Sequence, residues 1–213
     1  MAYKGILFDF DGVVVDSMHQ HYDAWSKAFS EKKVYFSNEE FFQLEGQGLP
    51  KIAKMLGEQR GLSEQDILDI IVNKVRYYYS LHKTQFYDYF LTMIKNLKSK
   101  NIPMAVVTGG QRERVFNILD EYFKGIFKNA VTIDDVVNGK PNPEPFLKGA
   151  EMLELDAKEC IVIENAPLGI SSAKNAGCLV IAVKTTLSDK YLGEADFIYD
   201  TFQEVERKIF SLL

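Results

Sequence analysis

The sequence lacks the features that mark secreted, metal-clustered and nucleic-acid-binding proteins. It holds only two cysteines in 213 residues, Cys160 and Cys178, and both lie in apolar runs. We therefore expect buried thiols and neither a disulfide nor a metal pair. No Cys/His cluster has the spacing of a zinc site. The net charge is -5, and no run of Lys and Arg indicates a surface for nucleic acid.

Long apolar runs are also missing. No stretch reaches the roughly 18 residues that a membrane span needs, and the apolar residues after Lys4 meet Asp9 too soon to form a signal-peptide core. There is no internal repeat, low-complexity tract or long linker. We therefore expect a cytoplasmic monomer without membrane or nucleic-acid partners. With 46% hydrophobic and 13% aromatic residues, the chain can build one large or two small domains.

The first apolar segment runs straight into two acids and a glycine. Residues 3–10 are almost wholly apolar, which favours a strand buried on both faces of a parallel sheet. Such strands deliver functional residues at their carboxyl ends. Asp9 and Asp11 are two positions apart, so in an extended segment they point the same way, and Gly12 lets the chain turn after them. Two converging carboxylates repel unless a cation or a proton lies between them.

A calcium-binding turn or a solvated loop is the alternative for this acidic pair. An EF-hand loop that begins at Asp9 would need a glutamate at its twelfth position, where Gln20 stands, and a helix in front of it. The EF-hand is therefore excluded, while a metal-assisted site and a solvated loop both remain open from these residues alone.

Residues 17–84 carry only helical signals. Apolar side chains recur at helical spacing from Met18 to Phe29, and Ser37 and Ser63 open segments that look like capping boxes. No strand interrupts this block, so it cannot lie within a sheet that resumes near Pro103. We predict that residues 17–84 form an inserted helical cap, and that residues 1–16 and 85–213 form the catalytic core.

After residue 102, short apolar runs alternate with helices. This alternation predicts an α/β fold, a doubly wound parallel sheet with a Rossmann-like core, whose right-handed crossovers bring all strand ends to one edge. The predicted strands cover residues 104–108, 130–133, 160–164, 179–184 and 197–199; the predicted helices cover 112–123, 143–155, 166–176 and a last segment capped by Thr201 and Glu204.

The predicted strand ends carry further polar groups. Thr108, Gly109 and Gly110 follow one strand, and this segment is either a plain turn or a set of N–H donors open to an anion. Lys140 lies between Gly139 and Pro141, and a solvated surface lysine is its default reading. Glu164 ends an apolar strand, where a carboxylate is costly unless it is exposed or ligated.

Four segments in this order resemble the four motifs of the haloacid dehalogenase-like hydrolase superfamily: residues 9–12, 107–110, 139–143 and 163–170. Within it the chain is similar to the β-phosphoglucomutase and sugar-phosphate phosphatase group, which carries a helical cap between the first two motifs. The resemblance covers essentially the whole chain. It implies an aspartyl-phosphate mechanism with Mg²⁺ as cofactor.

The resemblance also implies roles for the acids. Asp9 is expected to be the nucleophile, and Asp11 the general acid and base. The Mg²⁺ ligands are expected to be Asp9, the Asp11 carbonyl oxygen and Glu164, with Asn165 beside them. Dehalogenases of the superfamily lack the second aspartate, since a halide leaves without protonation. Because this chain carries Asp11 at that position, a dehalogenase is not expected.

The remaining motif residues are expected to bind the phosphoryl group. Thr108, the Gly109 amide and Lys140 are expected to hold its oxygens, with Gly110 beside them. Three departures from the family pattern stand out. Asn165 occupies a position where many relatives have aspartate, the Pro-Gly pair that ends the cap is replaced near residues 88–90, and residues 48–50 stand where the mutases carry an arginine.

In the predicted cap, His21 and Trp25 share a helix face and match positions near the mouth of the site in this group. The alternative is a core tryptophan and a surface histidine. Lys51 and Lys74 are candidate replacements for the absent arginine. We predict a Mg²⁺-dependent phosphatase that acts on a small phosphorylated metabolite, a sugar phosphate. The alternatives are a β-phosphoglucomutase-type mutase and a phosphometabolite-binding protein without turnover.

Overall fold

The computed structural model describes residues 3–81, 83–127 and 129–213; residues 1–2, 82 and 128, which fall within the predicted core and cap, lie outside the described part. All strand pairs in its single sheet are parallel. The strands are β1 (Gly5–Phe8), β2 (Met104–Val107), β3 (Ala130–Val131), β4 (Cys160–Glu164), β5 (Leu179–Val183) and β6 (Phe197–Tyr199), in the order β3-β2-β1-β4-β5-β6. The predicted doubly wound sheet is confirmed.

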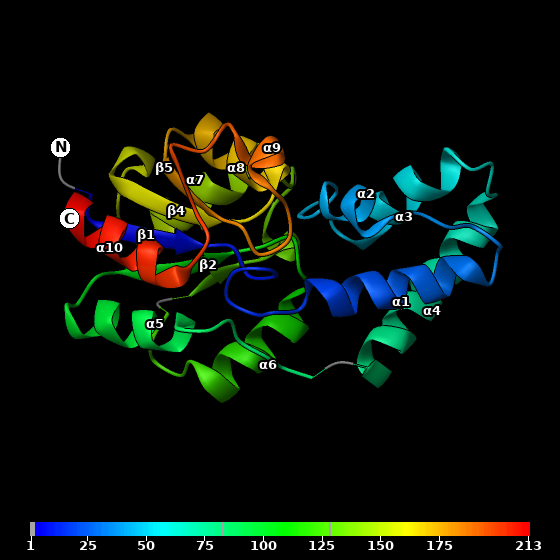
Figure 1. Ribbon diagram of the computed structural model, residues 1–213, viewed down its shortest axis with the longest axis horizontal. Coiled ribbons are helices and arrows are strands. Elements are labelled where there is room, and N and C mark those ends of the chain that lie inside the picture. Colours follow the sequence, from blue (N-terminus) through cyan, green and yellow to red (C-terminus); the bar gives the residue numbers. More distant parts are fainter. Residues whose placement is uncertain (1–2, 82, 128) are drawn as a thin grey trace.

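Helices cover both faces of this sheet. They are α5 (Phe90–Ser99), α6 (Arg112–Tyr122), α7 (Glu144–Met152), α8 (Pro167–Ala176), α9 (Asp189–Leu192) and α10 (Phe202–Leu212), with 3-10 turns η1 (Ile133–Asp135) and η2 (Ala157–Glu159). Figure 1 shows α7 and α8 above the strands and α5 below them.

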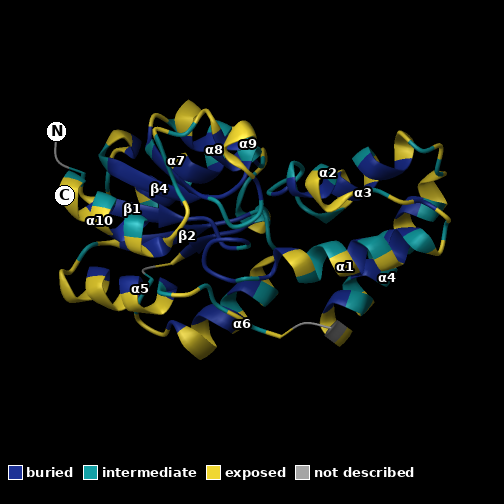
Figure 2. Cartoon of the chain, viewed as in Figure 1, coloured by how far each residue is buried: buried dark blue, intermediate teal, exposed yellow. Residues whose placement is uncertain are grey.

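The apolar strands divide their side chains between these two layers. Successive side chains of a strand point to opposite faces. Leu7 of β1 therefore belongs to the cluster that contains α7 and α8, while Ile6 and Phe8 belong to the cluster of α5, α6 and α10. Figure 2 shows the central strands buried and the outer faces of the helices exposed, whereas the edge strand β6 is only half-buried. Both cysteines are free and buried, as predicted.

Four further helices lie to one side of the sheet (Figure 1). They are α1 (Met18–Ser30), α2 (Asn38–Phe42), α3 (Leu49–Glu58) and α4 (Glu64–Leu81). Trp25 and Phe29 of α1 and Ile70 of α4 belong to one buried cluster. Two segments of the chain, near residues 16 and 85, join these helices to the sheet, and we call them the chain crossings. They lie side by side, and the Asp16 amide donates to the Gln85 carbonyl at 2.9 Å. We call α1–α4 and their connections the cap helices.

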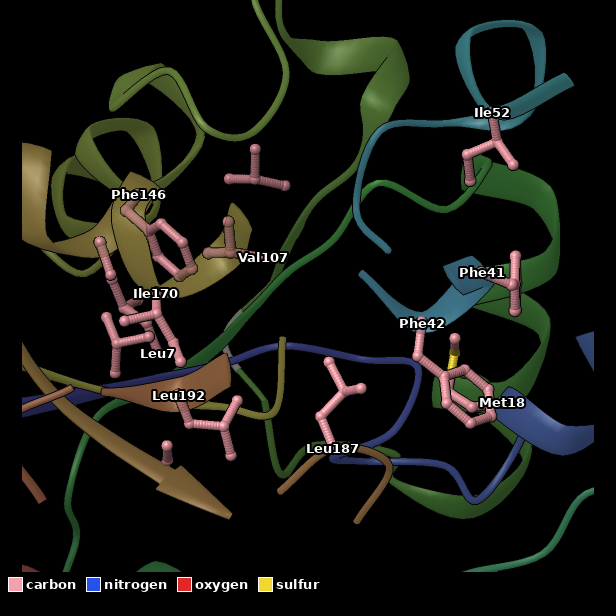
Figure 3. Close-up of a cluster of buried hydrophobic side chains, with 14 of the residues drawn as sticks. Leu7, Met18, Phe41, Phe42, Ile52, Val107, Phe146, Ile170, Leu187 and Leu192 are labelled. Carbon is pink, nitrogen blue, oxygen red and sulfur yellow. The ribbon is translucent and has the colours of Figure 1, made fainter. Parts of the chain in front are cut away.

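One buried cluster extends from the sheet to the cap helices. Figure 3 shows Leu7, Val107 and Phe146 in one group and Met18 with Phe42 in another, with Leu187 drawn between the two groups. This apolar contact holds the base of the cap helices against the core at the carboxyl edge of the strands. Within the described residues, no helix is long and apolar enough to cross a membrane.

Helix starts follow the capping signals where the sequence offers them. Thr201 and Glu204 form the predicted capping box of α10. Ser63 and Asp66 also bond reciprocally at the start of α4. At α2 only half of the box forms, since Ser37 accepts from the amide of Glu40.

The structure shortens several predicted elements and adds two helices, α5 and α9; the predicted helix at residues 143–155, for example, covers Glu144–Met152. The first strand ends at Phe8, two residues before its predicted end. The predicted strand at residues 130–133 shortens to Ala130–Val131, because Thr132 and Asp135 cap the η1 turn. Neither α5 nor the short helix α9 between β5 and β6 was predicted. Helix α5 starts from Tyr89, which has a left-handed backbone (φ 67) and no side-chain capping bond, so no sequence signal marks its beginning.

Helix α5 offers a test of core packing. Phe90 is fully buried and makes edge contacts with Phe8, Phe123 and Phe202, with ring centroids 6.2, 6.2 and 5.2 Å away. We expect Phe90→Ala to lower the free energy of unfolding by about 3 to 5 kcal/mol, because it leaves a cavity. Urea denaturation measures this. Leu91→Ala, on the exposed face of the same helix, is the control and should change it by no more than about 0.5 kcal/mol; an equal effect of both would contradict the packing described.

Candidate active site

The carboxyl edge of the sheet gathers the predicted motif residues. Asp9 follows β1, Thr108 follows β2 and Glu164 ends β4. Because these neighbouring strands are parallel, their ends meet at the same edge. Lys140 reaches this edge from the connection between η1 and α7 and is only 2% exposed. The surface-lysine alternative is therefore wrong.

Lys140 joins two of the buried acids. Its ammonium donates to Asp9 Oδ1 at 2.5 Å and to Glu164 Oε1 at 2.7 Å. It also lies 4.9 Å from the centre of the Phe146 ring. The second Glu164 oxygen accepts from the amides of Asn165 and Ala166 at 2.7 and 2.9 Å. Glu164 is therefore held at both oxygens, and it fixes Lys140 against Asp9.

The ionisation of Asp9 and Lys140 reflects this shared burial. Burial, reinforced by the Glu164 charge and only partly offset by Lys140, raises the pKa of Asp9 to about 8. Burial disfavours the charged form of Lys140, but the carboxylates of Asp9 and Glu164 outweigh it and raise the pKa of Lys140 above its ordinary value. One ammonium does not balance the negative charge at this edge.

Asp11 has a different set of partners. Ser17 donates to its Oδ1 at 2.6 Å, and Arg114 binds both of its oxygens, with 2.9 Å from Nη1 to Oδ1. Burial opposes ionisation, but Arg114 and then His21 outweigh it and hold the pKa of Asp11 well below its usual value. Asp9 and Asp11 were expected to converge on one cation. Here their side chains bind Lys140 and Arg114 respectively, because the extended strand ends before them at Phe8.

His21 links Asp11 to the cap helices. Its Nε2 lies 3.2 Å from Asp11 Oδ1 and its Nδ1 3.0 Å from Lys74 Nζ, and its ring stacks on Tyr78 at 4.2 Å. Burial, with Lys74 beside it, lowers the pKa of His21 to about 3. A neutral ring that accepts from Lys74 at Nδ1 donates from Nε2 to Asp11. The surface-histidine alternative is wrong, since the side chain is only 12% exposed.

Lys74 is buried among aromatic rings. It is 3% exposed, and its ammonium lies 5.4 Å from the Trp25 ring centre and 4.8 Å from that of Tyr78. Burial and then the Arg114 charge lower the pKa of Lys74 to about 7. Trp25, at 1% exposed, is a core residue that also lines the cavity.

A cavity of about 470 Å³ lies between the cap helices and the sheet edge. Most predicted site residues line it: Asp9, Asp11, His21, Trp25, Lys51, Lys74, Thr108, Gly109 and Gly110. Lys51 lies at its wall with an exposed side chain. Lys140, Glu164 and Asn165 lie buried behind it. The Thr108 hydroxyl accepts from the Gly110 amide at 2.9 Å, which shapes the loop that faces the cavity.

Three residues of the site were not found from the sequence. Glu45, Tyr78 and Arg114 all line the cavity. Glu45 lies three residues before the segment 48–50, which departs from the family pattern, and Arg114 lies four residues after the motif at residues 107–110. Nearness to these two segments was the available signal for both residues, whereas Tyr78 carried none.

A cation would find oxygen ligands at this edge. Among the described residues, no three Asp, Glu, His or Cys side chains form a set that could hold a metal by themselves. A metal here would therefore also need the Asp11 carbonyl or an amide oxygen. Asn165 Oδ1 is such an oxygen, since it is buried and accepts no hydrogen bond. The donor set of carboxylate, carbonyl and amide oxygens suits a hard cation such as Mg²⁺.

Residues 6–183 match the family model described as haloacid dehalogenase-like hydrolase. The chain belongs to the haloacid dehalogenase-like hydrolase family. Hexitol phosphatase A of Escherichia coli is 29% identical over an alignment of 215 positions, which spans 96% of this chain and 94% of that protein. β-phosphoglucomutase of Bacillus subtilis is 26% identical over 192 residues, which cover 84% and 83%.

A solved structure from Bacteroides vulgatus shares the fold, with a TM-score of 0.88 at 30% identity, and the match covers 99% of this chain and 89% of that one. The resemblance drawn from the four motifs is confirmed at the level of the family. The predicted class of enzyme, a phosphoric monoester hydrolase, is confirmed with it.

The Asp11–Arg114 pair gives a test of the site's electrostatics. We expect Arg114→Met to lower the free energy of unfolding at pH 7 by about 3 kcal/mol, because it leaves a buried carboxylate without its main partner. The folded pKa of Asp11 lies below its unfolded value near 3.8, so the pair stabilises above that pH. Its contribution, and with it the effect of the substitution, should shrink as the pH falls below 3.8.

Urea denaturation at pH 7 and pH 3 measures this effect, and Asp11→Asn/Arg114→Met is the matched double variant. It should recover part of the loss at pH 7, because the unpaired charge is removed. A loss for Arg114→Met that is the same at both pH values would contradict the ion pair.

Proposed function

We propose that the chain is a Mg²⁺-dependent phosphatase that hydrolyses a small phosphorylated metabolite, a sugar or polyol phosphate, through an aspartyl-phosphate on Asp9. The observation that carries this proposal is the buried contact of Lys140 with both Asp9 and Glu164 beside a cavity of about 470 Å³. The hexitol phosphatase of Escherichia coli, similar over almost the whole chain, supports the choice of substrate class.

The first half-reaction uses the two aspartates. An Asp9 oxygen attacks phosphorus, the bond from phosphorus to the ester oxygen breaks, and the leaving alkoxide takes a proton from Asp11. Lys140 lies against Asp9, so its positive charge lowers the repulsion between that carboxylate and the phosphoryl oxygens. Thr108 and the Gly109 amide, which face the cavity, donate to those oxygens.

The second half-reaction returns the enzyme to its starting state. Asp11 takes a proton from water, and the oxygen of that water attacks the phosphorus of the Asp9 phosphate and releases inorganic phosphate. Without ligand, Arg114 and His21 favour the ionised form of Asp11, which is the form that this step requires. The first step requires the protonated form, and a phosphate dianion in the cavity favours it through its negative charge.

Bound Mg²⁺ would supply a hard positive charge that neutralises the phosphoryl oxygens. The groups that would hold it are Asp9, the Asp11 carbonyl oxygen, Glu164 and the amide oxygen of Asn165. The acidity of this edge supports the assignment, since Glu164 is one of the charges that raise the pKa of Asp9.

The size and lining of the cavity support a metabolite of sugar size. Its volume of about 470 Å³ lies within the range of roughly 300 to 1,000 Å³ that is usual for small-molecule sites. Trp25 and Tyr78 offer flat apolar surfaces, and Gln47 and Lys51 offer polar groups for hydroxyls. We further propose that residues 17–84 act as a cap domain that opens at the paired crossings near residues 16 and 85, and that the protein works as a cytoplasmic monomer.

A phosphosugar mutase is the second candidate, favoured by the similarity to the β-phosphoglucomutase of Bacillus subtilis. A mutase must bind a bisphosphate in two orientations, so it needs a strong cation at the far end of the cavity. Among the described lining residues, the only arginine is Arg114. It comes from α6 in the core, and Asp11 binds its guanidinium. We therefore favour water as the phosphoryl acceptor.

Removal of the nucleophile tests the covalent mechanism. We expect Asp9→Asn to lower phosphate release by about a thousandfold or more, because an amide cannot form the phosphoenzyme. Release of phosphate from a sugar phosphate in the presence of Mg²⁺ measures this. Asp23→Asn, an exposed aspartate of α1, is the control and should retain the activity of the parent. Turnover of Asp9→Asn close to that of the parent would rule the mechanism out.

A substrate panel separates the three candidate functions. We expect sugar and polyol phosphates with Mg²⁺ to yield free phosphate, and β-glucose 1-phosphate to yield little hexose 6-phosphate, since water is the expected acceptor. Hydrolysis above background eliminates the binding protein without turnover. If hexose 6-phosphate forms much faster than phosphate is released, and only with a bisphosphate primer, the hydrolase is wrong and the mutase is right.

A further inference from the structure

Glu45 brings a carboxylate from the cap helices into the buried acidic edge. It lies on the loop between α2 and α3 and is only 6% exposed. Its Oε2 accepts from Asn165 Nδ2 at 3.1 Å, so the loop touches the core immediately after Glu164. Asn165 itself is fully buried. The contact joins two segments 120 positions apart in the sequence.

The backbone beside Glu45 is packed as tightly as the side chain. A Cβ atom added at Gly109 would lie 2.4 Å from the Gly46 carbonyl oxygen, and one added at Gly46 would lie 3.0 Å from Lys140 Cδ. Real Cβ atoms do not approach backbone atoms that closely, so glycine at position 109 is what lets the loop reach the core. The close packing of the Gly46 backbone against Gly109 and Lys140 therefore holds Glu45 beside the buried acids Asp9 and Glu164.

The Glu45–Asn165 pair leaves two buried oxygens without a donor. They are Glu45 Oε1 and Asn165 Oδ1. The Glu45 carboxylate orients the amide, because an ionised carboxylate can only accept and Asn165 Nδ2 therefore faces it; the same nitrogen donates to Thr186 Oγ1 at 3.1 Å. The flipped amide would set its oxygen against the Glu45 carboxylate and lose the bond to it. Buried oxygens without donors are rare and costly, and two in one contact indicate a missing positive partner.

The charges around this contact indicate the sign of that partner. Burial, and then the like charges of Asp9, Glu164 and Asp11, raise the pKa of Glu45 well above its usual value, and Lys140 opposes this only in part. Lys140 already binds Asp9 and Glu164. At the end of β4 the chain offers one negative side chain, Glu164, and one neutral side chain, Asn165. Glu45 adds a second carboxylate at this point, and it comes from outside the core.

We propose that Glu45 is a cap-borne carboxylate of the cation site, and that Asn165 positions it there, so that a bound divalent cation holds residues 44–48 against the core. This inference rests on the proposed function, in that the cation is its Mg²⁺. Asn165 suits the role because its amide donates to Glu45, whereas a carboxylate at this position would repel it. A bound cation then favours contact of residues 44–48 with the core, and this contact raises the affinity for the cation to the same extent.

Direct Mg²⁺ binding tests this inference without any turnover. Isothermal titration calorimetry with MgCl₂ compares the parent protein with Glu45→Gln, which keeps the shape and removes the charge. We expect Mg²⁺ to bind the variant about tenfold more weakly or worse, the size of effect seen when a group around a metal is lost. Glu58→Gln, an exposed carboxylate of α3, is the matched control and should bind as the parent does. Thermal unfolding without Mg²⁺ checks that each variant is folded.

The double variant Glu45→Gln/Asn165→Asp moves the charge from the cap loop to the core. The amide at position 45 can then donate to the carboxylate at position 165, so the contact is kept with its polarity reversed. We expect the Mg²⁺ affinity of this variant to return to within about threefold of the parent, which corresponds to less than about 1 kcal/mol. If the Mg²⁺ affinity of the double variant stayed as low as that of Glu45→Gln, the negative charge of Glu45 would not be what the cation needs, and the inference would be overturned.

Hydrogen exchange of the amides of residues 44–50 gives a second measurement, which reports how firmly this loop is held and not how tightly the ion binds. Mg²⁺ should slow amide exchange there in the parent protein and leave it unchanged in Glu45→Gln. Equal Mg²⁺ affinity of the parent and Glu45→Gln would overturn the inference and leave the proposed function intact. No Mg²⁺ binding by the parent at millimolar concentrations would overturn both.

Discussion

The buried ammonium of Lys140 is the contact on which the rest of the site depends. It lies between Asp9, which follows β1, and Glu164, which ends the neighbouring strand β4. Without it, two carboxylates would be buried side by side with no cation between them, and an unpaired buried charge costs several kcal/mol. The ring of Phe146 lies 4.9 Å from this ammonium, and Gly46 packs against the methylene chain of Lys140, so both help to keep the ammonium in place.

The sequence predicted the parts of the site that depend on local order in the chain. An apolar strand that ends in Asp9, and another that ends in Glu164, place both acids at one edge as soon as the sheet is parallel. The burial of Lys140 followed only from the resemblance to a family, since its neighbours Gly139 and Pro141 fit a surface turn equally well. The local pattern therefore predicted the positions of the two acids, whereas the burial of Lys140 was predicted only by the resemblance to the family.

The contacts that join distant segments were beyond local reasoning. Glu45 and Arg114 each look like an ordinary charge on a solvated segment, and only the closed arrangement buries them beside Asn165 and Asp11. Helix α5 was missed for a different reason. Phe90, Met93, Ile94 and Leu97 recur at helical spacing and are buried, but no capping residue precedes them, so the pattern had no start signal.

The position of the cap helices is tied to the ionisation of Asp11. Ser17, just before α1, and His21, in its first turn, both bind this carboxyl, and Tyr78 of α4 lies 3.3 Å from the guanidinium of Arg114. Arg114 comes from α6 of the core, whereas Ser17 and His21 lie just before and within α1. In the proposed opening of the cap, a shift of α1 away from the sheet would remove two groups that favour the ionised form of Asp11 and leave Arg114 in place. In the proposed mechanism the proton on Asp11 would therefore respond to the same opening that admits substrate, because both depend on how closely α1 approaches the end of β1.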